Sequence, residues 1–287
     1  MAIEIVSDLE DSRLEPYRNL KATNLTRWSN RFVAEGTLVV ERLLASRFRV
    51  QSLLVSRRLA RQLPTTISPD CPIYLLEHEL AEQLVGYTFH TGILACGLRQ
   101  PSPSIDALSA TGDRFTLVAV CPNVNDPENI GAIIRLCAGF GVAGLVLGPG
   151  CADPFSRRVL RVSMGTALAL PIIESRDLHG DLMRLRDEFG FELCATMLDA
   201  AAEPLETTVP TNKMGILFGN EKHGLDAQWT GLCSRWLTIP MAPGADSLNV
   251  AVAAGIFFHH LRHLGQKSAI RQQKLLNPVR NEARPAP

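Results

Sequence analysis

The chain has 287 residues, of which 46% are apolar and 20% are charged, the composition of a globular protein. This composition excludes a disordered, collagen-like or coiled-coil protein as the main description. Lys and Arg number 29, as do Asp and Glu, so bulk positive charge cannot hold the whole chain on a nucleic acid. The length corresponds to about two domains of average size.

The seven cysteines are typical of a protein from a reducing compartment. Their number is odd and no Cys-x-x-Cys pair occurs, so the sequence indicates neither a disulfide framework nor a zinc site. No stretch approaches the roughly 20 apolar residues of a membrane-spanning helix, and the acidic N-terminal residues are unlike a signal peptide. We therefore expect a cytoplasmic protein with no membrane association and no bound metal.

Positive charge is concentrated in two parts of the chain. Residues 13–61 hold eleven Lys and Arg against three Glu, and residues 262–287 hold six against one. These local charges of +8 and +5 predict that one region contacts a polyanion. Solvated faces of surface helices would give the same pattern, so charge alone leaves both interpretations open.

A stretch rich in Pro and Ser, residues 99–112, predicts a linker between two parts of the chain. Before it, apolar periodicity predicts a helix over 33–44 and strands over 50–55 and 73–76. These elements make a small α/β domain of residues 28–98, preceded by an extension of residues 1–27. We expect little packing across the linker, so that the C-terminal part should fold without residues 1–104.

After the linker, strands and helices alternate over residues 113–265. The expected strands are 115–121, 145–147, 191–197, 214–218 and 236–239, and the expected helices are 130–137, 177–188 and 250–263. The alternation predicts an α/β domain with a parallel sheet. Residues 266–287, which hold three Pro and lack periodicity, are expected to form a flexible basic tail.

A Gly-x-Gly-x-x-Gly pattern at residues 139–144 raises the alternative of a dinucleotide-binding oxidoreductase. That fingerprint requires a strand before it and a helix after it, because the pyrophosphate binds at the N-terminus of the helix. Here the expected helix precedes the glycines and the expected strand follows them. The pattern therefore favours the end of a helix and a turn.

Three loops that follow expected strands are rich in Asn, Gly and Ser, namely 125–135, 217–225 and 239–250. The carboxyl ends of parallel strands meet at one edge of a sheet, where α/β proteins bind ligands. In the first loop, Asn129 is expected to cap the following helix and Arg135 to project away from its apolar stripe. Each loop alone could be an ordinary turn, but three on one sheet indicate a site.

The three loops resemble the signature motifs of the SpoU family of RNA ribose 2′-O-methyltransferases, part of the SPOUT superfamily. Residues 153–165 also resemble the family's second helix, although Arg stands at 157 and 158, where a Lys is usual. Segments 32–36 and 90–95 are similar to the family's small ribosomal-protein-like domain, which binds substrate RNA.

The resemblance implies a parallel-sheet α/β methyltransferase domain with a C-terminal trefoil knot, preceded by the RNA-binding domain. It implies ribose 2′-O-methylation of a structured rRNA or tRNA with S-adenosylmethionine as cofactor. The implied cofactor-binding residues are Leu217, Gly219, Asn220, Ile239, Met241, Ser247 and Leu248, and the implied catalytic residues are Arg135, Asn129, Glu221, Ser247 and Asn249. Together with the expected helix 250–263, which is apolar around most of its axis, it predicts a homodimer.

The sequence leaves three questions about mechanism and substrate open. Arg135 is expected to hold the neighbouring phosphate and the target hydroxyl, and Glu221 is the alternative general base. A protein that kept the fold and lost catalysis would bind RNA without methylating it. The sequence also leaves the RNA and the nucleotide unidentified, because RNA recognition depends on shape and on exposed single-stranded bases.

Overall fold

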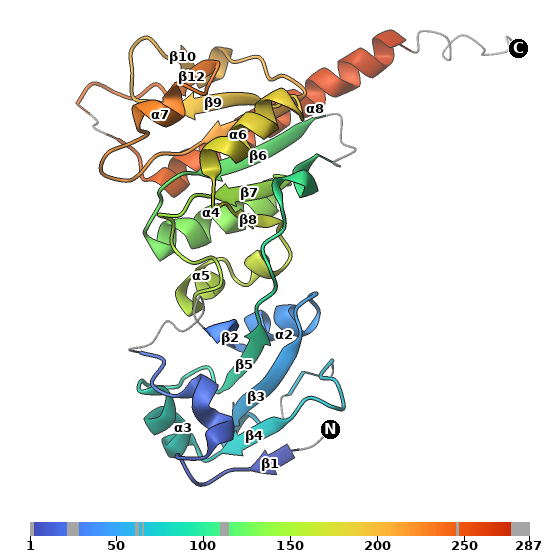
Figure 1. Cartoon of the computed structure of the whole chain (residues 1–287), viewed down its shortest axis with the longest axis vertical. Coiled ribbons are helices and arrows are strands. Elements are labelled where there is room, and N and C mark those ends of the chain that lie inside the picture. Colours follow the sequence, from blue (N-terminus) through green and yellow to red (C-terminus); the bar gives the residue numbers. More distant parts are fainter. Residues whose placement is uncertain are drawn as a thin grey trace, which may run out of the picture. The chain divides into compact units, whose positions relative to one another are not determined.

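The computed structural model of the chain describes residues 3–21, 29–60, 63–64, 66–109, 115–244 and 247–265, and the backbone of 266–276. The chain forms two compact units, each assembled from several segments (Figure 1). Unit 1 comprises Met1–Pro103, Asn125–Ala138 and Cys151–Ile172; unit 2 comprises Ser104–Val124, Gly139–Gly150 and Ile173–Pro287. No described helix combines the length and the apolar character needed to cross a membrane.

Unit 1 contains a mixed five-stranded sheet. In spatial order its strands are β1 (Ile3–Ile5), β4 (Ile73–Leu76), β3 (Val50–Ser56), β5 (Ile93–Leu98) and β2 (Arg31–Glu35). β1, β4 and β3 are parallel, whereas β5 is antiparallel to both β3 and β2. The helices of this unit are α2 (Thr37–Leu44), α3 (His78–Val85), α4 (Pro127–Phe140) and α5 (Arg157–Val162).

The start of unit 1 differs from the sequence-based expectation. The helix predicted over 33–44 begins at Thr37, because residues 31–35 form β2 and Gly36, with φ of +88°, separates the two elements. A short apolar run fits a buried strand as well as a helix, which explains the error. Residues 3–21 are part of the fold: the buried Tyr17 donates its hydroxyl hydrogen to the Ser52 carbonyl oxygen at 2.8 Å.

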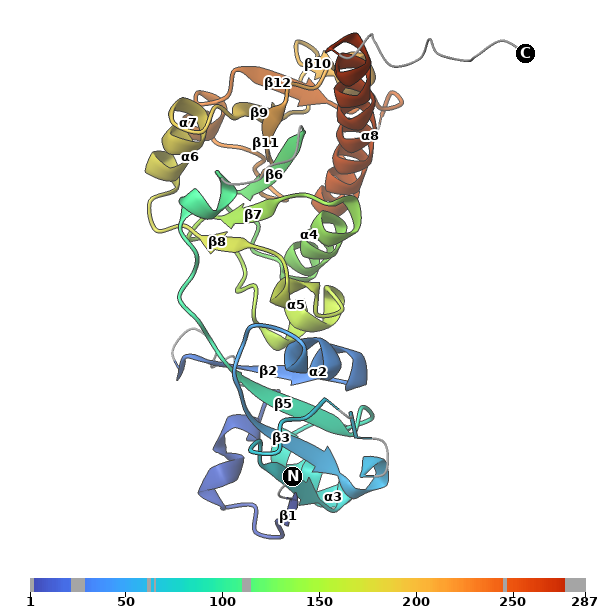
Figure 2. The same ribbon diagram turned by 90° about the vertical axis from the view of Figure 1, so that its right-hand side faces the viewer.

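Unit 2 contains a seven-stranded sheet that is covered on both faces (Figure 2). In spatial order its strands are β10 (Glu203–Pro204), β12 (Arg235–Thr238), β9 (Glu192–Thr196), β11 (Lys213–Leu217), β6 (Thr116–Cys121), β7 (Gly144–Leu147) and β8 (Ile172–Glu174). Each pairing from β10 to β7 is parallel, so the predicted α/β fold with a parallel sheet is confirmed.

Three helices cover the sheet of unit 2. α6 (Leu178–Asp187) and α7 (Ala227–Thr230) lie on one face, and α8 (Val250–Leu276) lies on the other (Figure 2). The flexible tail predicted from residue 266 is wrong as far as residue 276, because α8 continues to Leu276. The three Pro that suggested a loose tail all lie at 278 or beyond, outside the described residues.

The predicted linker, residues 99–112, is partly structured. It contains the 3-10 helix η3 (Ile105–Leu108), whose Ile105 and Leu108 are buried in the hydrophobic core of unit 2. The sequence carries only these two apolar anchors, too few to show a period. The other domain boundaries predicted from the sequence stay predictions.

Residues on both sides of the linker pack together within unit 1. Phe155 lies between Phe32 and Phe48, with ring centroids 5.5 Å and 5.3 Å away, and only 6% of its surface is exposed. Beside it, Arg99 and Asp153 form an almost fully buried ion pair at 2.9 Å. The expectation of little packing across the linker is therefore wrong, since deleting residues 1–104 would expose Phe155 and leave Asp153 without Arg99.

Replacing Phe155 with Ala should lower the free energy of unfolding by about 3–5 kcal/mol, because the cavity left among Phe32 and Phe48 cannot fully close. The matched control is Leu198→Ala, at a side chain that is 64% exposed, which should change it by less than about 0.5 kcal/mol. Denaturant unfolding of both variants measures the difference. Equal effects at the two positions would contradict the described packing.

Candidate functional site

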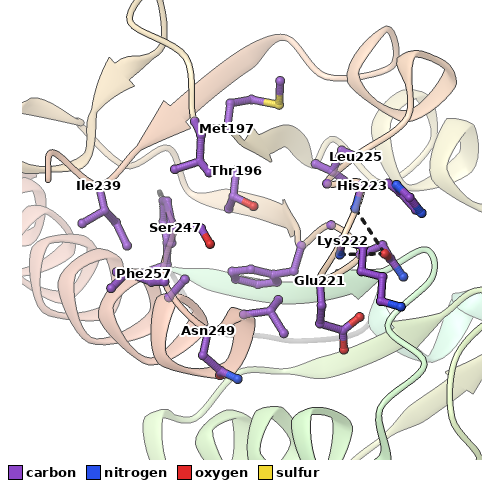
Figure 3. A pocket seen from close by; sticks show the side chains of 18 of the residues that line it. Thr196, Met197, Glu221, Lys222, His223, Leu225, Ile239, Ser247, Asn249 and Phe257 are labelled. Atoms are coloured by element: carbon purple, nitrogen blue, oxygen red, sulfur yellow. Dashed lines mark hydrogen bonds between the residues drawn. The ribbon is translucent and has the colours of Figure 1, made fainter. Parts of the chain in front are cut away.

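A cavity of about 610 Å³ opens at the carboxyl ends of β9, β11 and β12 in unit 2 (Figure 3). The loops after these three strands and the first turns of α8 surround it. Its lining consists of Thr196, Met197, Leu198, residues 218–225, Ile239, Met241, residues 247–250, Ala253 and Phe257. This volume lies within the range of pockets that bind small organic molecules.

The loop after β11 has a tightly fixed shape. The backbone N–H groups of Asn220 and Gly224 each donate to the other residue's carbonyl oxygen at 2.9 Å. A Cβ atom on Gly219 would lie 2.4 Å from the Gly224 carbonyl carbon, so a side chain does not fit there. Gly224 has a φ of +68°, in the region that favours glycine. Both glycines are therefore required by geometry.

The side chain of Asn220 organises the same loop. Its amide oxygen accepts hydrogen bonds from the backbone N–H groups of Lys222 and His223, at 2.9 Å and 3.3 Å. Its amide nitrogen donates to the Asn123 carbonyl oxygen at 2.9 Å, which ties the loop to the chain that follows β6. Asn220 thus shapes the wall from which the side chains of Glu221, Lys222 and His223 extend (Figure 3).

The floor of the cavity is aromatic. Phe218, which is 1% exposed, lies against Phe257 and Phe258 of α8, with ring centroids 6.0 Å and 5.4 Å away at steep angles. Such edge-to-face contacts hold the start of α8 against the end of β11. With Ile239 and Met241 nearby in the lining, this gives the cavity a large apolar surface beside its polar loops.

The loop before α8 supplies polar groups at the helix start. The Asn249 side-chain oxygen accepts from the backbone N–H groups of Ala251 and Val252, at 2.9 Å and 3.2 Å, which makes Asn249 the N-cap of α8. Ser247 and Leu248 precede it in the lining. Asn249 therefore has a structural role as a helix cap, in addition to any contact that it makes with a ligand.

The cavity brings together most of the residues that the sequence singled out. The predicted residues that line it are Gly219, Asn220, Glu221, Ile239, Met241, Ser247, Leu248 and Asn249. Leu217 does not line it. That residue is the buried end of β11, and its carbonyl oxygen accepts a hydrogen bond from the Thr196 hydroxyl at 2.9 Å.

The two remaining predicted residues lie on α4, in unit 1. Asn129 is buried and is the third residue of the helix. The expectation that it caps α4 is wrong, because the Asp126 carboxylate accepts from the Glu128 N–H at 2.8 Å and takes that position. Arg135 is exposed, whereas Ile133 and Ile134 are buried, so Arg135 does leave the apolar stripe as predicted.

The glycines at 139–144 do not form a dinucleotide fingerprint. α4 runs to Phe140 and β7 begins at Gly144, so a helix precedes the pattern and a strand follows it. Gly141 has a φ of +64°, as expected at the end of a helix. The order of elements argues against the oxidoreductase alternative.

Thr196, Met197 and Leu198 line the cavity, although the sequence did not indicate them. Thr196 ends β9 and the other two residues follow it; this strand was predicted, but not its place between β11 and β12. A parallel neighbour in that place must end at the same edge, so strand order was the missing signal. Phe218 and Phe257 were not predicted as site residues, because buried aromatic residues next to a strand or in a helix are equally typical of a hydrophobic core.

The described lining of this cavity holds neither a thiol nor a group of typical metal ligands. No cysteine is among its described lining residues, and burial raises the pKa of the Cys96 and Cys233 thiols to about 12. Within the described ranges, no three His, Cys, Asp or Glu side chains are grouped so that they could hold a metal ion.

Comparison with known proteins identifies the family of this chain. Residues 116–259 match the family described as the SpoU rRNA methylase family. An uncharacterised tRNA/rRNA methyltransferase of Mycobacterium bovis is 37% identical over 271 residues, covering 92% of this chain and 93% of the relative. The 23S rRNA (guanosine(2553)-2′-O)-methyltransferase RlmP of Bacillus subtilis is 28% identical over 257 residues, covering 90% and 98%.

A solved structure is also similar to this chain. The rRNA methyltransferase of Sinorhizobium meliloti, crystallised with AdoMet bound, superimposes with a TM-score of 0.77 and 26% sequence identity. The match covers 91% of this chain and 98% of that one.

Replacing Gly219 with Ala should weaken the binding of S-adenosylmethionine, the cofactor that the sequence resemblance implies, roughly tenfold, a loss of about 1.4 kcal/mol. The added methyl group would collide with backbone atoms of Gly224 and Leu225, which cannot move without opening the loop. The control is Gly139→Ala, where a Cβ meets nothing within 4 Å. Calorimetric titration of both variants measures the affinity; unchanged binding by Gly219→Ala would disprove the loop geometry.

Proposed function

Because the chain belongs to the SpoU rRNA methylase family, we propose that it methylates the 2′-hydroxyl of a ribose in rRNA or tRNA, with S-adenosylmethionine as methyl donor. The observation that carries this proposal is the cavity of unit 2, because two of the three signature loops line it together. The 2′-O-methyltransferase activity in the name of the Bacillus subtilis relative supports the same reaction.

The lining of the cavity suits S-adenosylmethionine, whose sulfonium supplies the electrophilic methyl group. The donor has an apolar adenine face, a polar ribose and a charged amino acid end, and the cavity has both kinds of surface. Ile239, Met241 and Leu248 provide apolar contacts, and Gly219 allows close approach of the backbone. The backbone around Leu217, Asn220 and Ser247 completes the proposed cofactor site.

Methyl transfer to a hydroxyl is an in-line displacement, so the residues must align a poor nucleophile and assist loss of its proton. We assign Arg135 to the target ribose, where its planar guanidinium can hold a phosphate and the hydroxyl together. Asn129, Ser247 and Asn249 order the site. Glu221, an exposed carboxylate in the cavity lining, is the alternative proton acceptor.

The N-terminal part of unit 1 is proposed to bind the RNA, as the ribosomal-protein-like domain of residues 28–98 implied by the resemblance. The charge of +8 counted over residues 13–61 overstates the net positive charge of this region. Carboxylates from outside residues 13–61 form ion pairs with several of its arginines. These pairs are Arg13 with Glu4 and Asp11, Arg18 with Glu10, Arg57 with Glu77, and Arg58 with Glu79. Arg47 and Arg49 lie exposed between α2 and β3, where a phosphate can reach them.

Three further properties are proposed from the family resemblance: a C-terminal trefoil knot, a homodimer and a cytoplasmic location. The dimer has support in α8, where Val252 and Ile256 are 54% and 39% exposed one turn apart. An apolar stripe of this kind on a helix gains stability when a second surface covers it.

The reaction is tested with S-adenosylmethionine that carries a tritiated methyl group and with rRNA and tRNA from a strain that lacks the protein. Digestion to nucleosides should place the label in a 2′-O-methylnucleoside. Label in a methylated base, or in no RNA, would contradict the proposed function.

Arg135→Ala should abolish methyl transfer and leave the S-adenosylmethionine affinity within a few-fold of the parent, since Arg135 is not among the residues that line the cavity. Arg135→Lys should also fail, because an ammonium cannot reproduce the planar two-point contact. Arg186→Ala, at an arginine paired with its neighbour Asp187, is the control. Retained turnover would refute the catalytic role, and lost affinity would place Arg135 in the cofactor site or the fold.

The parent protein should have the mass of a dimer at micromolar concentration, and Ile256→Glu should have the mass of a monomer. A carboxylate in the apolar stripe of α8 would lose its hydration if the stripe were covered. Met183→Glu is the matched control, because Met183 has the same 39% exposure but lies on α6, which covers the opposite face of the sheet. A monomeric parent would contradict the proposed dimer.

A further inference from the structure

We propose that Arg157 is a positioning residue that fixes the RNA-binding part of the chain to the helix that carries Arg135, and so sets where the bound ribose lies. The inference rests on the proposed function. All of the contacts that carry it lie within unit 1, among β2, α5 and α4.

Arg157 is the first residue of α5 and makes three contacts with the N-terminal part of unit 1. One guanidinium nitrogen donates to the Glu35 carboxylate at 2.6 Å, and another donates to the Leu20 carbonyl oxygen at 3.4 Å. The guanidinium carbon lies 4.4 Å from the centre of the Tyr87 ring. One planar group therefore joins α5 to β2, to the chain before β2 and to the turn after α3.

Glu35 makes this contact selective for a cation. Its side chain is only 4% exposed, at the end of β2, where burial strongly disfavours a carboxylate without a partner. The Thr91 hydroxyl donates to its second oxygen at 3.5 Å, a long and weak hydrogen bond. The ion pair with Arg157 is much shorter than this hydrogen bond, and it connects β2 to the start of α5.

The other side of α5 packs closely on α4. A Cβ on Gly131 would lie 2.7 Å from the Val162 Cβ, so glycine is needed for the two helices to approach. One turn earlier, Arg158 forms an ion pair with Glu128. Both contacts lie on the side of α4 that faces α5. Arg135 follows Gly131 by four residues, and it therefore lies one turn further along the same side of α4.

A second connection lies at the far end of α5. Arg42 of α2 donates to the Met164 carbonyl oxygen at 2.5 Å, directly after α5 ends. The segment is therefore held at its beginning by Glu35 and at its end by α2. A short helix fixed at both ends transmits a displacement of β2 and α2 to its neighbour α4 instead of absorbing it.

The identity of the side chain at position 157 matters for this role. The resemblance leads one to expect Lys near this place, and the chain has Arg. A lysine could keep the charge toward Glu35, but one ammonium group cannot also reach the Leu20 carbonyl and stack on Tyr87. Arg157→Lys therefore removes the geometric constraint and retains the charge.

The first test compares Arg157→Lys with Arg161→Lys, the same change at an exposed position of the same helix. kcat at saturating RNA is measured per functional cofactor site, counted by S-adenosylmethionine titration, so that unfolded protein does not enter the rate. Misplacement of a bound group by about 1 Å costs up to a hundredfold in rate. We expect kcat to fall roughly tenfold or more for Arg157→Lys and to stay within about twofold for Arg161→Lys, with the cofactor and RNA dissociation constants of both variants unchanged.

A double variant separates positioning from a general loss of stability. Arg157→Met leaves the Glu35 carboxylate buried without its cation, whereas Arg157→Met with Glu35→Gln removes both charges. The double variant should recover the melting temperature that the single variant loses, while its kcat stays low because the guanidinium contacts of Arg157 are still absent. Recovery of kcat together with the melting temperature would assign the pair to stability alone and overturn the proposal.

Hydrogen exchange provides a readout that does not depend on activity. In Arg157→Lys, the amides of β2, α2 and α5 should exchange faster, and those of β9 and β11 in unit 2 should not change. Unchanged exchange in β2 and α5, or an unchanged kcat, would overturn the role of Arg157. A parent protein that methylates no RNA would instead contradict the proposed function, and the exchange measurement would still decide whether Arg157 holds these elements together.

Discussion

Parallel pairing of β12, β9 and β11 is the constraint from which the cavity of unit 2 arises. It brings the chain after residues 196, 217 and 238, far apart in sequence, to one edge of the sheet. The loops there can be irregular because the strands before them are paired in the sheet, and most residues of β9 and β11 are buried. Gly219 lets the chain double back within van der Waals distance of Gly224, and Asn220 holds the resulting loop with side-chain hydrogen bonds. The parallel sheet thus determines where the cavity lies, and a few Gly and Asn residues determine the shape of the loop that lines it.

Unit 1 depends on a different kind of interaction, namely charges that are buried in pairs. Arg99 with Asp153 and Arg157 with Glu35 connect the N-terminal sheet with the segment 151–172, and the Phe155 ring fills the space beside the first pair. Buried ion pairs add little net stability, but they favour one specific arrangement, because a buried charge without its partner is costly. For an enzyme that must place a large RNA against a small reacting group, fixed direction is the useful property. This explains why polar contacts occur where a hydrophobic contact would be enough for stability.

The sequence predicted those features that repeat with a period or that carry chemistry within one loop. The strands 115–121 and 214–218 and the loops at 217–225 and 239–250 were found because each shows its pattern locally. Strand order was not predictable in this way, so the contribution of Thr196 to the cavity was missed. The start of the helix expected over 33–44 was wrong, because an apolar run does not distinguish a buried strand from a helix. The Arg157 contacts with Glu35 and Leu20 join residues more than a hundred positions apart, which no local pattern records.

We propose that the chain modifies the ribose of a defined RNA nucleotide. The most direct measurement is a map of 2′-O-methylation across all rRNA and tRNA from cells with and without the gene, with Arg135→Ala as a third sample. One or a few ribose methylations should be absent both from cells without the gene and from the Arg135→Ala sample, and no base methylation should change. Identical maps with and without the gene, or full methylation in the Arg135→Ala sample, would contradict this proposal.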